Sequence, residues 1–217
     1  MITDEAGARA WIAAMPDVDA AGVERLDTLV ALLELENAQQ NLVSANSLDA
    51  VWQRHLADSA QLLAHVSRET AGSWLDLGTG AGFPGLVVAA LQPHRRVVLV
   101  ESRARRIDWL ERAAAALGLH HVRVVGARLE TVEALSVDVI SARAFAPLDR
   151  LIAMAARFST SETQWVLPKG RSAAQDLAML RGWIHTFHVQ QSLTDPDAGV
   201  IVGTLHGPRA GRKGPKA

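Results

Sequence analysis

The spacing of apolar residues changes near residue 70, and this change divides the chain into two parts. In the first part, apolar residues recur three or four positions apart, as they do on one face of a helix. The clearest run is Val23, Leu26, Leu29, Val30 and Leu33. Ser47 is placed to cap a second helical pattern, and residues 41–44 interrupt the spacing between the two. The pattern predicts an N-terminal helical extension over residues 1–70.

From residue 73 onward, short apolar runs alternate with helical patterns, which is typical of an α/β fold. The predicted strands cover 73–77, 96–101, 121–125, 136–141, 163–168, 183–192 and 200–206. The predicted helices cover 84–91, 103–117, 147–158 and 172–182. Continuously apolar strands indicate a parallel sheet buried on both faces, and the last two strands, which no helix separates, favour an antiparallel hairpin at its edge. We therefore predict a Rossmann-like domain over residues 71–207 with a mostly parallel seven-stranded sheet.

Residues 73–85 combine a short strand, a glycine-rich turn and the start of a helix. This arrangement lets the backbone of an α/β fold approach a nucleotide-like ligand. The glycines are Gly78, Gly80, Gly82 and Gly85. The last three satisfy the G-x-G-x-x-G fingerprint of dinucleotide-binding folds, so an NAD-type ligand stays open. The longer pattern, which begins at Asp76, resembles the first motif of S-adenosylmethionine (SAM) methyltransferases.

Charged residues stand at or just after the ends of the predicted strands. They are Asp76, Glu101, Glu130 and Arg143. Ligands of open α/β sheets bind at the carboxyl ends of the strands, so we expect these side chains to converge on one edge. Glu101 can accept hydrogen bonds from both hydroxyls of a ribose, which supports a nucleoside cofactor without separating NAD from SAM.

Composition excludes several classes of function. The chain has 49% apolar residues, a net charge of −1 and no cysteine, which rules out disulfides, zinc held by cysteine and a cysteine nucleophile. No apolar run is long enough to span a membrane, and the N-terminus lacks a secretory pattern, so we expect a cytoplasmic protein without a membrane contact. No residues stand at metal-ligand spacing. Residues 208–217 form a flexible basic tail that either touches phosphates or is a solvated terminus.

Four further segments sit in a recognisable order around the glycine turn. They are residues 41–44 (Asn-Leu-Val-Ser), 54–59 (Arg-His-x-x-Asp-Ser), 141–146 (Ser-Ala-Arg-Ala-Phe-Ala) and Lys169-Gly170. Together with residues 75–85, they closely resemble the bacterial small-subunit rRNA guanine-N7 methyltransferases, the RsmG or GidB family. The resemblance runs from about residue 41 to 206. Two departures are Phe83, where leucine is frequent, and Ala142 between Ser141 and Arg143.

The resemblance implies a class I SAM-dependent methyltransferase fold and places SAM on the glycine turn. It implies that SAM contacts Gly78, Phe83, Leu129, Glu130 and Arg143. The glycine motif and the strand ends add Asp76, Gly80, Gly82 and Glu101 to the expected cofactor-binding residues. Arg143 would also position the entering base, and no general base is expected. The implied substrate is a guanine of 16S rRNA, in the small ribosomal subunit or an assembly intermediate. From the residues themselves, we expect Arg54, His55 and Lys169 to face the RNA, and we expect no metal.

The residues present are compatible with a guanine N7 target. N7 carries an exposed lone pair, so its attack on a sulfonium methyl group requires no proton to be removed first. The chain lacks the Asn/Asp-Pro-Pro-Tyr/Phe element that grips an exocyclic amine, and it lacks the cysteine needed to methylate C5 of a pyrimidine. Two alternatives stay open: a SAM methyltransferase with a non-RNA substrate, and an NAD(P)-binding oxidoreductase.

His55, Asp58 and Ser59 share one face of a helix, because they stand at positions i, i+3 and i+4. A hydrolytic triad is disfavoured, since its members come from separate elements. Two interpretations remain. This face packs on the glycine turn while Arg54 or His55 touches RNA phosphate, or it forms a hydrogen-bonded seam between the N-terminal helices and the core.

Overall fold

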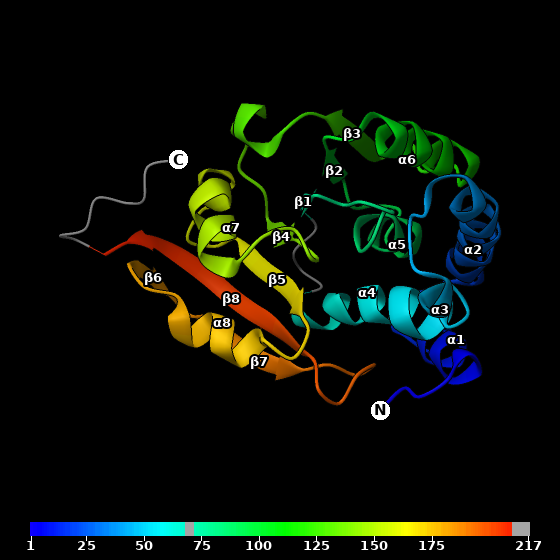
Figure 1. The fold of residues 1–217 in the computed structure, drawn as a ribbon, viewed down its shortest axis with the longest axis horizontal. Helices are drawn as coiled ribbons and strands as arrows, with labels where there is room; N and C mark the ends of the chain where they lie inside the picture. Colours follow the sequence, from blue (N-terminus) through cyan, green and yellow to red (C-terminus); the bar gives the residue numbers. More distant parts are fainter. Residues whose placement is uncertain (68–71, 210–217) are drawn as a thin grey trace.

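A mixed sheet forms the centre of the molecule (Figure 1), in a computed structural model that describes residues 1–67 and 72–209. Its strands are β1 (Trp74–Leu77), β2 (Val97–Glu101), β3 (Val122–Gly126), β4 (Val139–Ser141), β5 (Gln164–Lys169), β6 (Trp183–His185), β7 (His188–Gln191) and β8 (Gly199–Pro208). The strand order is β3-β2-β1-β4-β5-β8-β6, and β7 also pairs with β8. Strands β1 to β5 run parallel, and β8 runs antiparallel to β5, β6 and β7. The predicted antiparallel edge is confirmed.

Within residues 1–67 and 72–209 the sheet has eight strands, whereas the apolar pattern predicted seven. The single strand expected over 183–192 is divided into β6 and β7, which pair with different parts of β8. The register shifts between Ile184 and His185, because His185 faces Leu205 while Ile184 faces Gly207. An irregularity of this kind interrupts the ladder and bends the strand, and alternation of side chains alone does not reveal it.

Helices cover both faces of the sheet (Figure 1). On one face lie α5 (Gly85–Leu91) and α6 (Ala104–Ala116), together with the N-terminal helices; on the other lie α7 (Leu148–Ala155) and α8 (Ala173–Met179). The N-terminal elements are α1 (Glu5–Ala13), α2 (Ala20–Gln40), α3 (Ala45–Leu48), a π-helical turn (Trp52–Ala57), α4 (Asp58–Ala60) and a 3₁₀ turn (Gln61–His65). Two further 3₁₀ turns are Leu129–Thr131 and Ala156–Phe158.

The N-terminal helices share a hydrophobic core with the sheet. Buried residues of α2, such as Leu26 and Leu33, belong to the same apolar cluster as α5, and the Arg25 Nε donates to the carbonyl of Ala90 at 2.8 Å. The break predicted at residues 41–44 is present, because α2 ends at Gln40 and its C-cap, Asn41, has a left-handed φ of 44°. The predicted cap is displaced by three residues, since the Ser44 Oγ, not that of Ser47, accepts the capping hydrogen bond.

At its other end, the described chain runs past the predicted domain limit. Strand β8 continues to Pro208, and the Arg209 backbone N–H donates to the carbonyl of Gly182 at 2.9 Å. The rest of the predicted basic tail, residues 210–217, lies outside the described residues.

Candidate active site at the carboxyl ends of the strands

Asp76 anchors the glycine turn from beneath. Its carboxylate is fully buried; Oδ2 accepts from the Gly85 N–H at 3.0 Å and Oδ1 accepts from the Ser141 hydroxyl at 2.7 Å. Ser141 in turn accepts from the indole N–H of Trp74 at 2.8 Å. Burial raises the pKa of Asp76 to about 6. With no exposed surface, this carboxylate can serve a ligand only by holding the turn in shape.

The absence of a side chain at Gly85 allows α5 to start directly on the sheet. A Cβ at this position would lie 2.2 Å from the Leu99 Cδ2 and 2.9 Å from the Asp76 Oδ2. Only glycine fits this approach, so the last glycine of the run serves the packing of helix on strand.

A cavity of about 220 Å³ opens above the turn. Its walls come from four separate elements, through Gly78, Glu101, Leu129 and Phe145. Glu101 is mostly buried: its Oε2 accepts from the Gly80 N–H at 3.1 Å, and its Oε1 accepts from the backbone N–H of Ser102 at 2.7 Å. The lining is mixed, because Arg103 and Arg106 border the cavity as well as Leu129 and Phe145. A carboxylate, apolar side chains and a backbone without a side chain together suit a nucleoside, which has hydroxyls to donate and an apolar base. The residues present therefore fit SAM.

We expect Gly78→Ala to raise the dissociation constant of SAM about tenfold or more, because the added methyl group crowds the cavity and leaves its other contacts misplaced. Gly78 has φ +61°, and a Cβ there would lie 2.1 Å from the Phe145 Cδ2, so the ring must move. Isothermal titration with SAM measures the change.

Gly118→Ala is the matched control. Gly118 has a similar φ of +66°, but nothing lies within 4 Å of the position of its Cβ. It carries the same backbone strain, about 1–2 kcal/mol, without the crowding. Equal SAM affinity in the Gly78 variant and the wild type would contradict the prediction, as would equal losses in the two variants.

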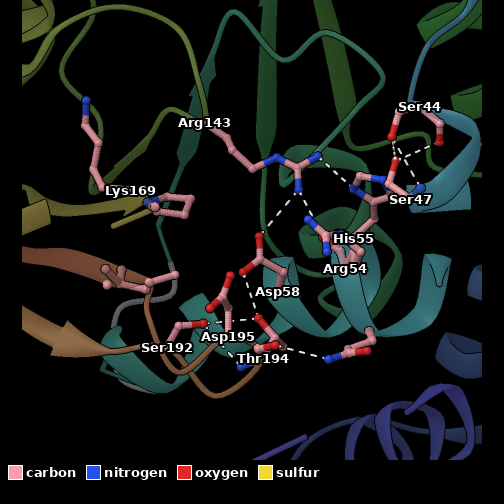
Figure 2. Close-up of a pocket in the computed structure, with 16 residues that line it drawn as sticks. Ser44, Ser47, Arg54, His55, Asp58, Arg143, Lys169, Ser192, Thr194 and Asp195 are labelled. Carbon is pink, nitrogen blue, oxygen red and sulfur yellow. Dashed lines mark hydrogen bonds and ion pairs between the residues drawn. The ribbon is translucent and has the colours of Figure 1, made fainter. Parts of the chain in front are cut away.

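A second cavity, of about 380 Å³, is shown in Figure 2. Its side chains come from α3 and its N-cap, from the π-helical turn and α4, from the ends of β4 and β5, and from the loop that leads into β8. Those labelled in the figure are Ser44, Ser47, Arg54, His55, Asp58, Arg143, Lys169, Ser192, Thr194 and Asp195. The second cavity therefore joins the N-terminal helices to the carboxyl edge of the sheet.

Arg143 reaches across this cavity toward the helix that carries His55 and Asp58 (Figure 2). Its Nη2 lies 3.1 Å from the His55 Nδ1, and its Nη1 lies 3.4 Å from the Asp58 Oδ2. The guanidinium also lies over the ring of Phe83, 5.2 Å from its centroid. The His55 ring stacks on the same phenyl ring, with centroids 4.9 Å apart and planes at 8°. Phe83 thus packs the glycine turn against the second cavity.

His55 is held as a neutral imidazole. Burial and the neighbouring positive charge of Arg143 lower its pKa to about 3. Lys169 is also engaged: its Nζ donates to the carbonyl of Ala146 at 3.2 Å and lies 3.4 Å from the Asp176 Oδ2. His55 and Lys169 both line the second cavity, and both make contacts with other residues of the protein.

The predicted site residues fall into three groups. Gly78, Glu101 and Leu129 line the first cavity. The second is lined by Arg54, His55, Arg143 and Lys169. The third group is buried and supports the glycine turn; it consists of Asp76, Gly80, Gly82 and Phe83. Glu130 is exposed beside Leu129.

Sequence reasoning missed Phe145 as a wall of the first cavity, although it stands in the segment 141–146 that carried the resemblance. It also missed Thr194 and Asp195 in the second cavity. Their loop carries no motif that could have indicated the contact.

Within residues 1–67 and 72–209, no group of three or more histidine, aspartate or glutamate side chains is placed to hold a metal ion. Among the helices of these residues, none combines the length and the apolar character needed to cross a membrane.

Comparison with known proteins identifies the family of the chain. A family model described as GidB, rRNA small subunit methyltransferase G, matches residues 23–195. The protein named ribosomal RNA small subunit methyltransferase G of Erythrobacter litoralis is 60% identical over 204 residues, 94% of this chain and 97% of the relative. Its namesake from Novosphingobium aromaticivorans is 58% identical, over 94% of this chain and 90% of the relative.

Solved structures agree on the fold. A SAM-dependent methyltransferase from Aquifex aeolicus superposes with a TM-score of 0.57 at 13% identity, over 82% of this chain and 97% of that one. A mutant of MtNAS in complex with S-adenosylmethionine superposes with a TM-score of 0.58 at 15% identity, over 94% of this chain and 84% of that one. The match of the family model and the close relatives show that the chain belongs to the rRNA small subunit methyltransferase G family of SAM-dependent methyltransferases.

Proposed function

We propose that this enzyme transfers the methyl group of SAM to N7 of a guanine in 16S rRNA, within the small ribosomal subunit or an assembly intermediate. The observation that carries the proposal is the position of the loop after β4, which borders both cavities. Ala144 and Phe145 line the first cavity and Arg143 lines the second. A cofactor in the first cavity would therefore meet a base in the second across this loop. Cytoplasmic placement, where ribosomes assemble, is part of the same proposal.

The chemistry requires positioning more than proton transfer. Bound SAM supplies an electrophilic methyl group on its sulfonium, and guanine N7 attacks with a lone pair that carries no proton. Two candidate bases of the second cavity are already engaged, because Asp58 pairs with Arg143 and the His55 Nδ1 faces the same guanidinium. Holding two reactants in line supplies a large part of such a rate enhancement.

The positive charges of the second cavity suit an RNA ligand. Arg54, Arg143 and Lys169 line it together, and lysine and arginine side chains contact phosphates in most nucleic-acid complexes. Asp58 and Asp195 offset part of this charge. The proposal therefore assigns the RNA to the second cavity and gives Arg143 the task of orienting the base.

The test uses small subunits that lack the modification, incubated with the enzyme and radiolabelled SAM. We expect label in 16S rRNA at one guanine, which cleavage selective for 7-methylguanine then locates. SAM binding without label in 16S rRNA would overturn the substrate assignment. Calorimetric titration with NADH is the control for the dinucleotide alternative, because SAM but not NADH is expected to bind.

A further inference from the structure

Arg143 is surrounded by three side chains, His55, Asp58 and Phe83, which we name the arginine clamp. Each holds the guanidinium by a different interaction: an acceptor nitrogen at 3.1 Å, a carboxylate oxygen at 3.4 Å and an aromatic face at 5.2 Å. The backbone carbonyl of Arg54 adds a fourth contact, at 3.4 Å from Nη1. A guanidinium presents its donors in a rigid plane, so partners on two of its nitrogens fix its orientation.

The contact with Arg143 determines the protonation of His55. Arginine has donors only, so the nitrogen that faces it must accept, and the proton of the neutral ring stands on Nε2. His55 is 8% exposed, and its Nε2 has no hydrogen-bond partner among the residues that the structure describes. A protonated ring would direct an N–H at the guanidinium and add a third positive charge beside Arg143 and Arg54. The nitrogen that carries the proton, Nε2, is buried, so the ring does not present its N–H to a ligand at the surface.

Asp58 is oriented independently of Arg143. Its Oδ1 accepts from the Thr194 hydroxyl at 3.1 Å and from the Gln61 Nε2 at 2.9 Å, which leaves Oδ2 for the guanidinium. Gln61 also accepts from the backbone N–H of Leu193 at 2.8 Å. The loop that leads into β8 therefore braces the carboxylate, so the orientation of Asp58 toward Arg143 follows from contacts within the fold.

We infer that His55 and Asp58 are positioning residues, which hold the Arg143 guanidinium between the two cavities, and that His55 acts through Arg143 and not by contact with RNA phosphate. The inference rests on the proposed function in one respect, because it takes Arg143 to orient the target base. It replaces the expectation that His55 faces the RNA.

Two substitutions of His55 separate its interactions. His55→Phe keeps an aromatic ring for the stack on Phe83 but removes the acceptor, whereas His55→Asn keeps an acceptor oxygen close to the position of Nδ1. We expect the phenylalanine variant to lower kcat by about 10- to 100-fold, as misplacement of a reacting group does. Its KM for the subunit should stay within about twofold, as for an interaction felt only in the transition state. The asparagine variant should recover most of kcat.

His185→Phe is the matched control, because His185 also stacks on a phenyl ring, that of Phe187, with centroids 5.0 Å apart. It lies outside both cavities, so we expect wild-type methylation. If His55→Phe instead raised KM in a salt-dependent way and left kcat unchanged, His55 would be an RNA contact and the inference would be wrong. Loss of kcat in the asparagine variant equal to that in the phenylalanine variant would also overturn it.

A measurement without substrate keeps the inference separate from the proposed function. The tautomer and pKa of His55 can be followed by ¹⁵N NMR in the wild type and in Arg143→Ala. We expect an unprotonated Nδ1 at neutral pH in the wild type and a higher pKa in the variant, because a neighbouring positive charge is removed. An unchanged pKa would refute the clamp. Failure to label 16S rRNA, with the NMR result as expected, would refute only the substrate.

Discussion

Arg143→Ala lowers kcat for methyl transfer by about 100-fold or more, the scale of loss expected when a group that orients the reactants is removed. Arg143 is the one side chain that contacts His55, Asp58 and Phe83 among the residues described here, and it lines the second cavity. SAM affinity should change little, because Gly78, Glu101 and Leu129 line the separate first cavity. Single-turnover methylation of small subunits and calorimetric titration with SAM measure the two effects.

Arg143→Lys should rescue little of this loss. A lysine ammonium is a point charge, and it cannot face the imidazole nitrogen and the carboxylate along two fixed directions. Arg112→Ala sets the baseline, because Arg112 is an ion-paired arginine of α6 that faces Glu36 and Asp108. Near-normal kcat in Arg143→Lys would show that only the charge of residue 143 matters. If Arg143→Ala lowered kcat no more than Arg112→Ala does, Arg143 would have no role in the reaction.

Asp76→Ala should lower the free energy of unfolding by about 2–4 kcal/mol, because two buried donors lose their acceptor at about 1–3 kcal/mol each. The donors are the Gly85 N–H and the Ser141 hydroxyl. Removal of a buried carboxylate offsets part of the loss, since burial raises the pKa of Asp76. Urea denaturation measures the change, and Asp76→Asn is the control that keeps one acceptor. A loss below about 0.5 kcal/mol, the range of ordinary surface substitutions, would contradict this role.

The same carboxylate predicts a pH dependence. Burial raises the pKa of Asp76 from 3.8 to about 6. Between pH 3.8 and about 6, the folded state therefore holds a proton on Asp76 that the unfolded state has lost. Its stabilising contribution is therefore present below pH 3.8 and is lost as the pH rises through about 6. The unfolding free energy of the wild type minus that of Asp76→Asn should therefore fall as the pH rises from 3.8 to about 6. His55, with its lowered pKa, acts in the opposite direction but is common to both proteins, so its effect cancels.

The local sequence was sufficient to predict the glycine turn and the strand ends. Short-range rules decide these features: glycine tolerates the left-handed φ at Gly78, and an apolar run such as 97–100 forms a buried strand. Glu101 and Arg143 then follow their strands, and parallel strands bring their carboxyl ends to one edge. The positions of these side chains along the chain predicted where a ligand site would form.

The direction of several side chains was not predictable in this way. Phe83 belongs to the glycine turn, yet its ring packs under His55 and Arg143. The carboxylate of Asp76 points inward to Gly85 and Ser141. Each orientation depends on a partner far along the chain. The same holds for the loop at Thr194, which braces Asp58.

What the amino-acid sequence determined by itself is the type of fold, the glycine turn and the family, because propensity, spacing and motifs are properties of neighbouring residues. Only the tertiary structure decided how the candidate site is divided into two cavities and how Arg143 is held between them. The clamp brings together the helix of His55, the turn of Phe83 and the loop after β4. Packing between separate elements sets such distances and burial, and burial in turn makes His55 a neutral acceptor.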